Sequence, residues 1–266
     1  MISTTNPHSW ISRRRHSDIR FRLFCFPYAG GGTSVFQKWS QHLPSAVEIC
    51  AVKLPGRESK LNEPPFEELT PMVRTLAQVL RPVLDMPFAF FGHSMGGLIS
   101  FELARQLRKE RRLTPVYLFV SGYRAPQLKD PCPPIHQLPE DAFLLELRDT
   151  YGTPENVLHD PELTKLFLPL LRADFAVCET YTYTDEDPLD CPISVFGGVQ
   201  DSKVAYDELA AWRAQTNGSF SLRMFPGNHF FLESARIAVL GVLGQTLTDI
   251  LMQTSQGSVT NSDCPP

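Results

Sequence analysis

The chain has 266 residues, of which 42% are apolar, 11% aromatic and 20% charged. This composition is typical of a soluble globular protein with a full hydrophobic core, and it excludes a disordered chain, a collagen and a coiled coil. The net charge of −4 and the isoelectric point near 6.0 offer no basic surface to nucleic acid, whose phosphates need clustered Lys and Arg. We therefore expect one large domain without a nucleic-acid partner.

The N-terminal segment predicts neither a secretory signal nor a membrane anchor. Arg13, Arg14 and Arg15 are not followed by an apolar stretch, and no apolar run approaches the roughly 18 residues that cross a bilayer. We interpret residues 1–18 as a flexible extension, 19–252 as the folded domain and 253–266 as a flexible tail. A transit peptide is the weaker alternative for the start of the chain.

The six cysteines form no CxxC pair and show no metal-ligand spacing. Several stand inside apolar runs, where cysteine behaves as a small hydrophobic residue. We expect reduced thiols in a cytoplasmic protein, and neither a metal ion nor another cofactor.

Short apolar runs alternate with helical patterns along most of the chain. Strands are predicted at residues 20–27, 47–54, 88–91, 116–120, 193–196 and 220–225. Most of these runs are apolar throughout, as expected for parallel strands that are covered on both faces. In the last run Phe220, Leu222 and Met224 alternate with polar residues, which places that strand near an edge of the sheet.

Apolar residues spaced three and four apart predict helices between the strands. One starts near Thr70, interpreted as its cap, with Pro71 in the first turn. Another covers 95–109, and the last carries an apolar stripe from Leu240 to Ile250. This alternation predicts an α/β fold with a mostly parallel central sheet flanked by helices.

Residues 124–188 break the alternation, because no strand is convincing there although large apolar residues are frequent. A short helix and a longer one are predicted, with the apolar residues Phe143, Leu144, Leu147 and Tyr151 in the first and Leu163, Leu166, Phe167, Leu170, Leu171 and Phe175 in the second. More than sixty residues is too long for an ordinary connection. We interpret the segment as a helical lid over the strand ends, where α/β sheets bind ligands.

The residues Gly92-His93-Ser94-Met95-Gly96 match the pattern G-x-S-x-G. A predicted strand precedes them and a predicted helix follows, which is the setting of a nucleophile elbow. Such a turn strains the backbone of the serine, and the two glycines let strand and helix pass closely. We predict that Ser94 is a nucleophile; the alternative is an ordinary serine in a glycine-rich turn.

A serine nucleophile needs a general base, and seven histidines are available. His229 lies just past the strand 220–225, which is the position and chain order of the base in elbow folds. His93 is disfavoured because neighbouring residues on a sharp turn point apart. We predict His229 as the base; the alternative is a loop histidine without a role.

The base needs a carboxylate that fixes its tautomer. Asp201 follows the strand 193–196 and emerges at its C-terminal end, whereas Asp185, Asp187 and Asp190 precede that strand and lie at its other end. We predict Asp201 as the orienting acid; the alternative is a helix cap before Val204.

Acyl transfer also needs two N–H donors for the oxyanion. One is expected from the backbone of Met95, the residue after the nucleophile. The other should come from the loop 27–32, whose three glycines let the backbone aim an N–H inward. A phosphate cradle is the rival interpretation, but the loop lacks the end of a P-loop and the spacing of a dinucleotide fingerprint.

These features together resemble the type II thioesterases of the α/β-hydrolase superfamily, stand-alone enzymes that serve polyketide and nonribosomal peptide synthetases. The medium-chain acyl thioesterase of animal fatty acid synthesis is similar. Four segments within residues 20–250 carry the resemblance in family order: Phe26-Pro27-Tyr28-Ala29-Gly30-Gly31-Gly32, Leu54-Pro55-Gly56-Arg57-Glu58, Phe90-Phe91-Gly92-His93-Ser94-Met95-Gly96-Gly97 and Pro226-Gly227-Asn228-His229-Phe230-Phe231. Tyr28 departs from the His of many members, and the Arg-rich start has no counterpart that we can interpret.

The resemblance implies that Ser94, Asp201 and His229 form a catalytic triad and that the N–H groups of Ala29 and Met95 form the oxyanion hole. It implies an α/β-hydrolase fold with a lid over the acyl site, and a substrate on the phosphopantetheine arm of an acyl or peptidyl carrier protein. The expected enzyme is a monomeric cytoplasmic thioesterase, without a cofactor or membrane contact. It would remove aberrant or stalled acyl groups in polyketide, nonribosomal peptide or fatty acid synthesis, including antibiotic biosynthesis.

Three cations near a strand end, Lys53, Arg57 and Lys60, are candidates for contact with an acidic carrier protein, and a solvated surface is the alternative. The residues alone indicate only a serine hydrolase with an apolar lid. An esterase or acyltransferase acting on small soluble acyl donors is therefore the alternative enzyme. A catalytically silent binding protein of the same fold is the alternative outside enzymes.

Overall fold

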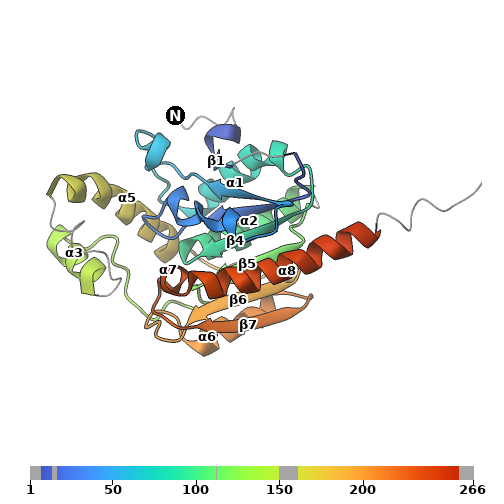
Figure 1. The fold of residues 1–266 in the computed structure, drawn as a ribbon. Coiled ribbons are helices and arrows are strands. Elements are labelled where there is room, and N and C mark those ends of the chain that lie inside the picture. The colour runs from blue at the N-terminus through green and yellow to red at the C-terminus, as the bar shows by residue number, and fades with distance from the viewer. Residues whose placement is uncertain (1–6, 14–16, 112, 150–160, 258–266) are drawn as a thin grey trace, which may run out of the picture.

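The computed structural model describes residues 7–13, 17–111, 113–149 and 161–257 (Figure 1). At its centre is a seven-stranded sheet with the order β1-β3-β2-β4-β5-β6-β7. The strands are β1 (Ile11–Ser12), β2 (Phe21–Phe26), β3 (Val47–Val52), β4 (Phe88–His93), β5 (Tyr117–Ser121), β6 (Ile193–Gly198) and β7 (Phe220–Phe225). Strand β1 runs antiparallel to β3, and every other neighbouring pair is parallel.

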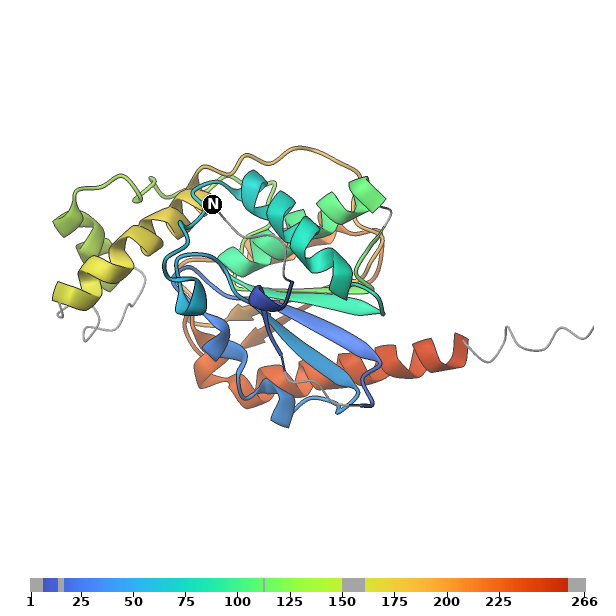
Figure 2. The same cartoon turned by 90° about the horizontal axis from the view of Figure 1, so that it is seen from above.

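Helices pack on both faces of the sheet (Figure 2). Helices α1 (Leu69–Leu80) and α2 (Met95–Arg111), teal to green, lie on one face, and α8 (Arg236–Gly257), red, lies on the other. Neighbouring residues of β4 show why: Phe90 packs with the apolar cluster under α1 and α2, and Phe91 with the cluster under α8. Successive side chains of a strand point to opposite faces, so an apolar strand requires cover on both.

The remaining helices connect the strands or follow the last one. They are α3 (Glu140–Asp149), α5 (Pro161–Glu179), α6 (Tyr206–Ala210) and α7 (Phe231–Ser234). Short 3₁₀ turns are found at Pro7–Ser9, Thr33–Phe36, Trp39–Gln41, Glu58–Lys60, Arg81–Val83 and Ala211–Gln215. Within the described ranges, no helix combines the length and the apolar character that crossing a membrane requires.

All six strands predicted from apolar runs are confirmed, with ends that differ by a few residues. Strand β7 forms an edge of the sheet, as its alternating pattern predicts. The cap predicted at Thr70 is wrong, because α1 starts at Leu69 and Glu68 takes the capping position. The tail predicted from residue 253 is wrong up to Gly257, where α8 ends; residues 258–266 lie outside the described part.

The flexible extension predicted for residues 1–18 is wrong for residues 7–13. Ile11 and Ser12 pair with Val52 and Ala51 of β3, and the side chain of Trp10 is completely buried. The Lys60 ammonium lies 4.0 Å from the centre of the Trp10 ring. The segment thus covers the edge of β3, which would otherwise expose unpaired backbone groups. Residues 1–6 and 14–16 lie outside the described part.

Between β5 and β6 the chain leaves the sheet, and α3 and α5 project beyond the strand ends (Figure 1). We call residues 124–188 the helical insertion. Phe143, Leu147, Leu168 and Phe175 form its own apolar cluster. Leu166, predicted on the apolar stripe, is 48% exposed, and Leu168 is buried instead. Tyr151 lies outside the described residues.

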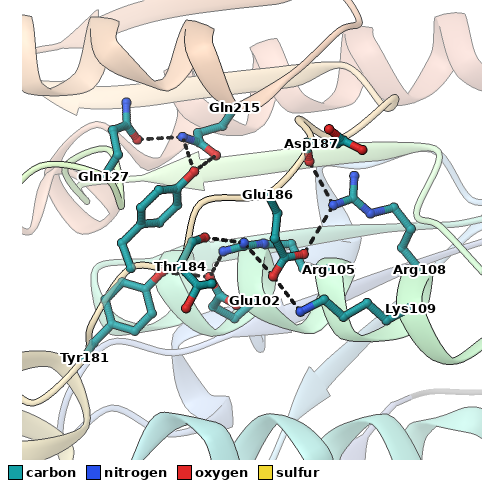
Figure 3. Close-up of polar contacts among 11 residues, drawn as sticks. Glu102, Arg105, Arg108, Lys109, Gln127, Tyr181, Thr184, Glu186, Asp187 and Gln215 are labelled. Carbon is teal, nitrogen blue, oxygen red and sulfur yellow. Dashed lines mark hydrogen bonds and ion pairs between the residues drawn. The ribbon is translucent and has the colours of Figure 1, made fainter.

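A polar network fastens the end of the helical insertion to α2 (Figure 3). Tyr181 donates a hydrogen bond of 2.7 Å to Glu102, and the Arg105 guanidinium donates to the carbonyl of Thr184 at 2.5 Å. Arg105 also pairs with Glu102 and Glu186, at 2.6 and 2.7 Å. The side chain of Arg105 is 3% exposed, whereas its partners Glu102 and Glu186 are 19% and 18% exposed, so the buried guanidinium stands at the centre of the network on the same helix that begins next to Ser94.

The described cysteines are free thiols, and Cys25, Cys50 and Cys191 are buried. Burial raises the pKa of Cys50 and of Cys191 to about 12. These thiols therefore stay protonated at neutral pH and serve as apolar core residues.

The burial of Trp10 predicts that the N-terminal segment stabilises the domain. Trp10→Ala should lower the free energy of unfolding by about 3–5 kcal/mol, because it leaves a large cavity in the core. Urea denaturation measures this loss. Ser12→Ala, an exposed position on the same short strand, should change it by less than about 0.5 kcal/mol. Equal, small effects of both substitutions would show that the segment does not contribute to stability.

Candidate active site

Ser94 occupies the turn between β4 and α2, and its backbone has a φ angle of +52°. A non-glycine residue at positive φ is strained and marks a constrained turn. A Cβ atom at Gly92 would lie 1.9 Å from the carbonyl oxygen of Gly96, and one at Gly96 would lie 2.1 Å from that of Phe26. Only glycine fits at these two positions, so the elbow predicted from G-x-S-x-G is present.

Asp201 and His229 come from the loops that follow β6 and β7. The distance between His229 Nδ1 and Asp201 Oδ2 is 2.8 Å, and the Asp201 side chain is 1% exposed. The other carboxylate oxygen accepts the backbone N–H of Lys203 at 2.8 Å. A carboxylate only accepts hydrogen bonds, so it holds the proton on Nδ1 and leaves Nε2 of His229 able to take one up.

Ser94, His229, Tyr28 and Ala29 line one cavity of about 590 Å³. These residues follow β4, β7 and β2, and the parallel sheet brings the C-terminal ends of its strands to one edge. Met95 is the first residue of α2, where backbone N–H groups have no partner within the helix. The structure therefore brings these predicted residues to the same edge of the sheet, with Asp201 bonded to His229.

Residues of the helical insertion also line this cavity. Leu147 of α3, and Leu171 and Phe175 of α5, line it together with Tyr181. These apolar side chains give the cavity a hydrophobic part, beside charged lining residues such as Lys129 and Glu179.

His93 is completely buried and lies beside His229, with 5.2 Å between the ring centres. Its Nδ1 shares a hydrogen bond of 2.9 Å with Ser121 Oγ. Burial, together with the neighbouring His229, holds the pKa of His93 well below its usual value. The ring is therefore neutral at pH 7 and packs against the predicted base.

Two other histidines, His42 and His136, do not line the cavity. His136 pairs with Glu179 at 2.6 Å. His42 is exposed and directly follows the 3₁₀ turn Trp39–Gln41. His16 and His159 lie outside the described residues. Asp190 contacts Asn217 at 3.1 Å, at the other end of β6 from Asp201.

The prediction that Lys53, Arg57 and Lys60 contact an acidic carrier protein is wrong for Arg57 and Lys60; Lys53 is half-buried, and for it the contact stays a prediction. Arg57 is 4% exposed and its guanidinium pairs with Asp174 at 2.7 Å; Lys60 is 3% exposed and pairs with Glu63. Sequence reasoning does not single out Asp174. The sequence feature that could have identified it is its position among the apolar residues of a predicted helix. A carboxylate that is buried there needs a partner.

The sequence and the fold are both similar to those of known proteins. The family model described as "Thioesterase domain" matches residues 21–247. The gramicidin S biosynthesis protein GrsT of Aneurinibacillus migulanus is 46% identical over 94% of this chain and 98% of its own length. The structure of the type II thioesterase BorB from the borrelidin biosynthetic cluster is 36% identical with a TM-score of 0.80, covering 89% of this chain and 96% of BorB. The structure of ClbQ from the colibactin NRPS/PKS pathway is 30% identical with a TM-score of 0.83, covering 88% and 99%.

The low pKa of His93 predicts a pH dependence of stability. Below about pH 6.5 the unfolded chain takes up a proton at this residue that the folded chain excludes, so stability falls as the pH falls. His93→Asn should reduce this slope by up to about 1.4 kcal/mol per pH unit. Denaturant titrations over a pH series measure it. The control His42→Asn, at an exposed ring, should keep the wild-type slope; a wild-type slope in both variants would contradict the buried neutral state.

Proposed function

The chain belongs to the thioesterase family, and we propose that it hydrolyses acyl thioesters on the phosphopantetheine arm of acyl or peptidyl carrier proteins. Release of aberrant or stalled acyl groups in polyketide, nonribosomal peptide or fatty acid synthesis is the role that fits this activity. The main support is the placement of Ser94, on its strained elbow, in the same cavity as His229, whose ring is bonded to Asp201.

In the proposed mechanism Ser94 Oγ attacks the thioester carbonyl carbon while His229 Nε2 takes the hydroxyl proton. The C–S bond then breaks, the leaving thiol receives that proton, and the acyl group remains on Ser94 as an ester. Water attacks the ester after losing a proton to His229, and the proton returns to Ser94 as the free acid departs. Asp201 stabilises the imidazolium in both steps.

Both attacks place a negative charge on the carbonyl oxygen. The N–H groups of Ala29 and Met95 are the proposed donors to it, and Met95 adds the positive end of the α2 dipole. Loss of one such donor typically costs about 10²–10³ in kcat. The orientation of these two peptide groups is thus as important to the proposed reaction as the three side chains.

We propose that the helical insertion serves as the lid of the acyl site. Leu147, Leu171 and Phe175 would contact the acyl chain, and their placement on α3 and α5 ties the shape of the cavity to the position of these helices. Water that these apolar side chains exclude would no longer compete for the oxyanion, which strengthens the hydrogen bonds to it.

Basic residues at the cavity, rather than Arg57 and Lys60, are the proposed contacts for an acidic carrier protein. Lys129 lines the cavity and is exposed, and Lys203 and Arg124 line it nearby. Arg124 already pairs with Asp130 at 2.9 Å. We therefore assign the steering role to Lys129, on the outer rim.

Ser94→Ala should lower turnover of an acyl-pantetheine thioester about 10⁶-fold, because the three residues act as a unit. Asp201→Asn should lower it about 10⁴-fold, because the amide favours the wrong tautomer of His229. Stopped-flow or thiol-release assays measure both.

Ser100→Ala is the matched control, since Ser100 is buried on α2 and donates only to the carbonyl of Gly97. It should keep near-normal turnover. Near-normal activity of Ser94→Ala would overturn the proposed nucleophile, and equal rates on the matched oxygen ester would favour a general esterase.

Carrier-linked substrate should be hydrolysed more efficiently than the free pantetheine thioester, with an advantage that shrinks as salt rises. Lys129→Glu should reduce kcat/KM for the carrier-linked substrate at low salt and leave the free thioester unaffected. Rates measured between low and high ionic strength test this. An unchanged salt profile would show that Lys129 does not meet the carrier.

A further inference from the structure

Helix α5 contacts the loop after β2 through a buried carboxylate. Asp174 is buried, and its Oδ2 accepts the backbone N–H of Gly30 at 2.7 Å. Its other oxygen accepts a hydrogen bond of 2.7 Å from Arg57. A residue of the helical insertion therefore bonds directly to the loop that carries Ala29.

Arg57 completes the contact from the loop after β3. Its guanidinium donates to the carbonyl of Gly31 at 2.9 Å through the nitrogen that Asp174 does not use. The side chains of Arg57 and Asp174 are 4% and 1% exposed. The ion pair of Asp174 and Arg57 thus fixes the backbone at two successive residues, through the N–H of Gly30 and the C=O of Gly31.

These bonds determine the direction of the Ala29 N–H. The N–H of Gly31 donates to the carbonyl of Tyr28 at 2.9 Å, and that carbonyl belongs to the same peptide unit as the N–H of Ala29. In a planar trans peptide the C=O and N–H point in opposite directions. Fixing Gly30 and Gly31 therefore fixes where Ala29 directs its hydrogen.

The loop needs such external bonds because its own sequence does not restrain it. Gly30 has a φ of +74°, and three consecutive glycines allow many other conformations. A Cβ atom at Gly30 would lie 2.6 Å from Cδ2 of Leu171 on α5, so the helix packs directly on this backbone. A buried ion pair is weak support for stability alone, since desolvation offsets its attraction.

We propose that Asp174 and Arg57 are positioning residues that hold the oxyanion loop 28–31 so that the Ala29 N–H is directed at the developing oxyanion. Because Asp174 lies on α5, the donor is correctly placed only while this helix is seated on the loop. This role rests on the proposed function, in which Ala29 is an oxyanion donor.

Asp174→Asn keeps the shape of the side chain but leaves the Arg57 charge unpaired. We expect kcat/KM for an acyl-pantetheine thioester to fall about 10²-fold, as for a misplaced oxyanion donor. Two inhibitors distinguish a misplaced oxyanion donor from a change in the shape of the cavity. A trifluoromethyl ketone analogue, which Ser94 converts to a hemiketal with an oxyanion, should lose the same factor in affinity. The matching acyl-pantetheine amide, which carries no oxyanion, should lose less than about threefold.

Glu48→Gln is the matched control. Glu48 is 1% exposed and pairs with Arg22 at 2.7 Å near the opposite end of β3. This variant should lower the melting temperature as Asp174→Asn does, with kcat/KM within about twofold of wild type. Since Arg57 and Asp174 act as one unit, the double variant Arg57→Gln/Asp174→Asn should lose no more kcat/KM than the more damaging single variant.

Arg57→Lys provides a second test if Asp174→Asn does not fold. A lysine keeps the charge but cannot bond Asp174 and Gly31 in the fork geometry of arginine, so we expect a roughly tenfold loss of kcat/KM. Equal losses of ketone and amide affinity, or wild-type kinetics in a folded variant, would overturn the positioning role. Ser94→Ala assayed in parallel separates the two proposals: if it is inactive while Asp174→Asn is normal, only the positioning role fails, and if it is active, the proposed function fails.

Discussion

The close crossing of β4, α2 and the end of β2 is the constraint on which the rest of the site depends. The carbonyl of Phe26 occupies the space that any side chain at Gly96 would need. This contact fixes the serine turn against the strand end from which the loop of Ala29 departs. The proposed nucleophile and the proposed oxyanion donor are therefore placed by backbone packing, and the strained φ of Ser94 persists because the surrounding contacts leave no alternative.

Two buried carboxylates then orient the polar groups that backbone packing leaves free. Asp201 holds the imidazole of His229, and Asp174 holds the loop of Ala29, with side chains that are each 1% exposed. Each has both oxygens bonded, which is the condition under which a charge tolerates burial. Asp201 bonds to residues in the loops that follow β6 and β7, whereas Asp174 joins the loop after β2 to the helical insertion.

The sequence predicts those parts of the fold that local patterns encode. Apolar runs identify the parallel strands, and the chain order of Ser94, Asp201 and His229 after three of them predicts the site residues. The sequence does not predict the environment of residues whose structural partners are distant along the chain. Arg57 looks like a surface cation until Asp174, 117 residues away, is packed against it. Strand β1 has only two residues, too few for any periodicity. Trp10 precedes it and is buried where β1 pairs with β3.

The contacts of α5 also limit how the cavity can change shape. Asp174 bonds to the oxyanion loop, Arg172 donates to the carbonyl of His136, and Glu179 accepts from the backbone of Ile135. All three follow Pro169, which stands inside the helix and cannot donate the hydrogen bond that would link its two halves. Movement that keeps these bonds leaves the part of α5 after Pro169 in place. Movement that breaks the bond between Asp174 and Gly30 would release the Ala29 loop, so the proposed oxyanion site would form only when α5 returns to this loop.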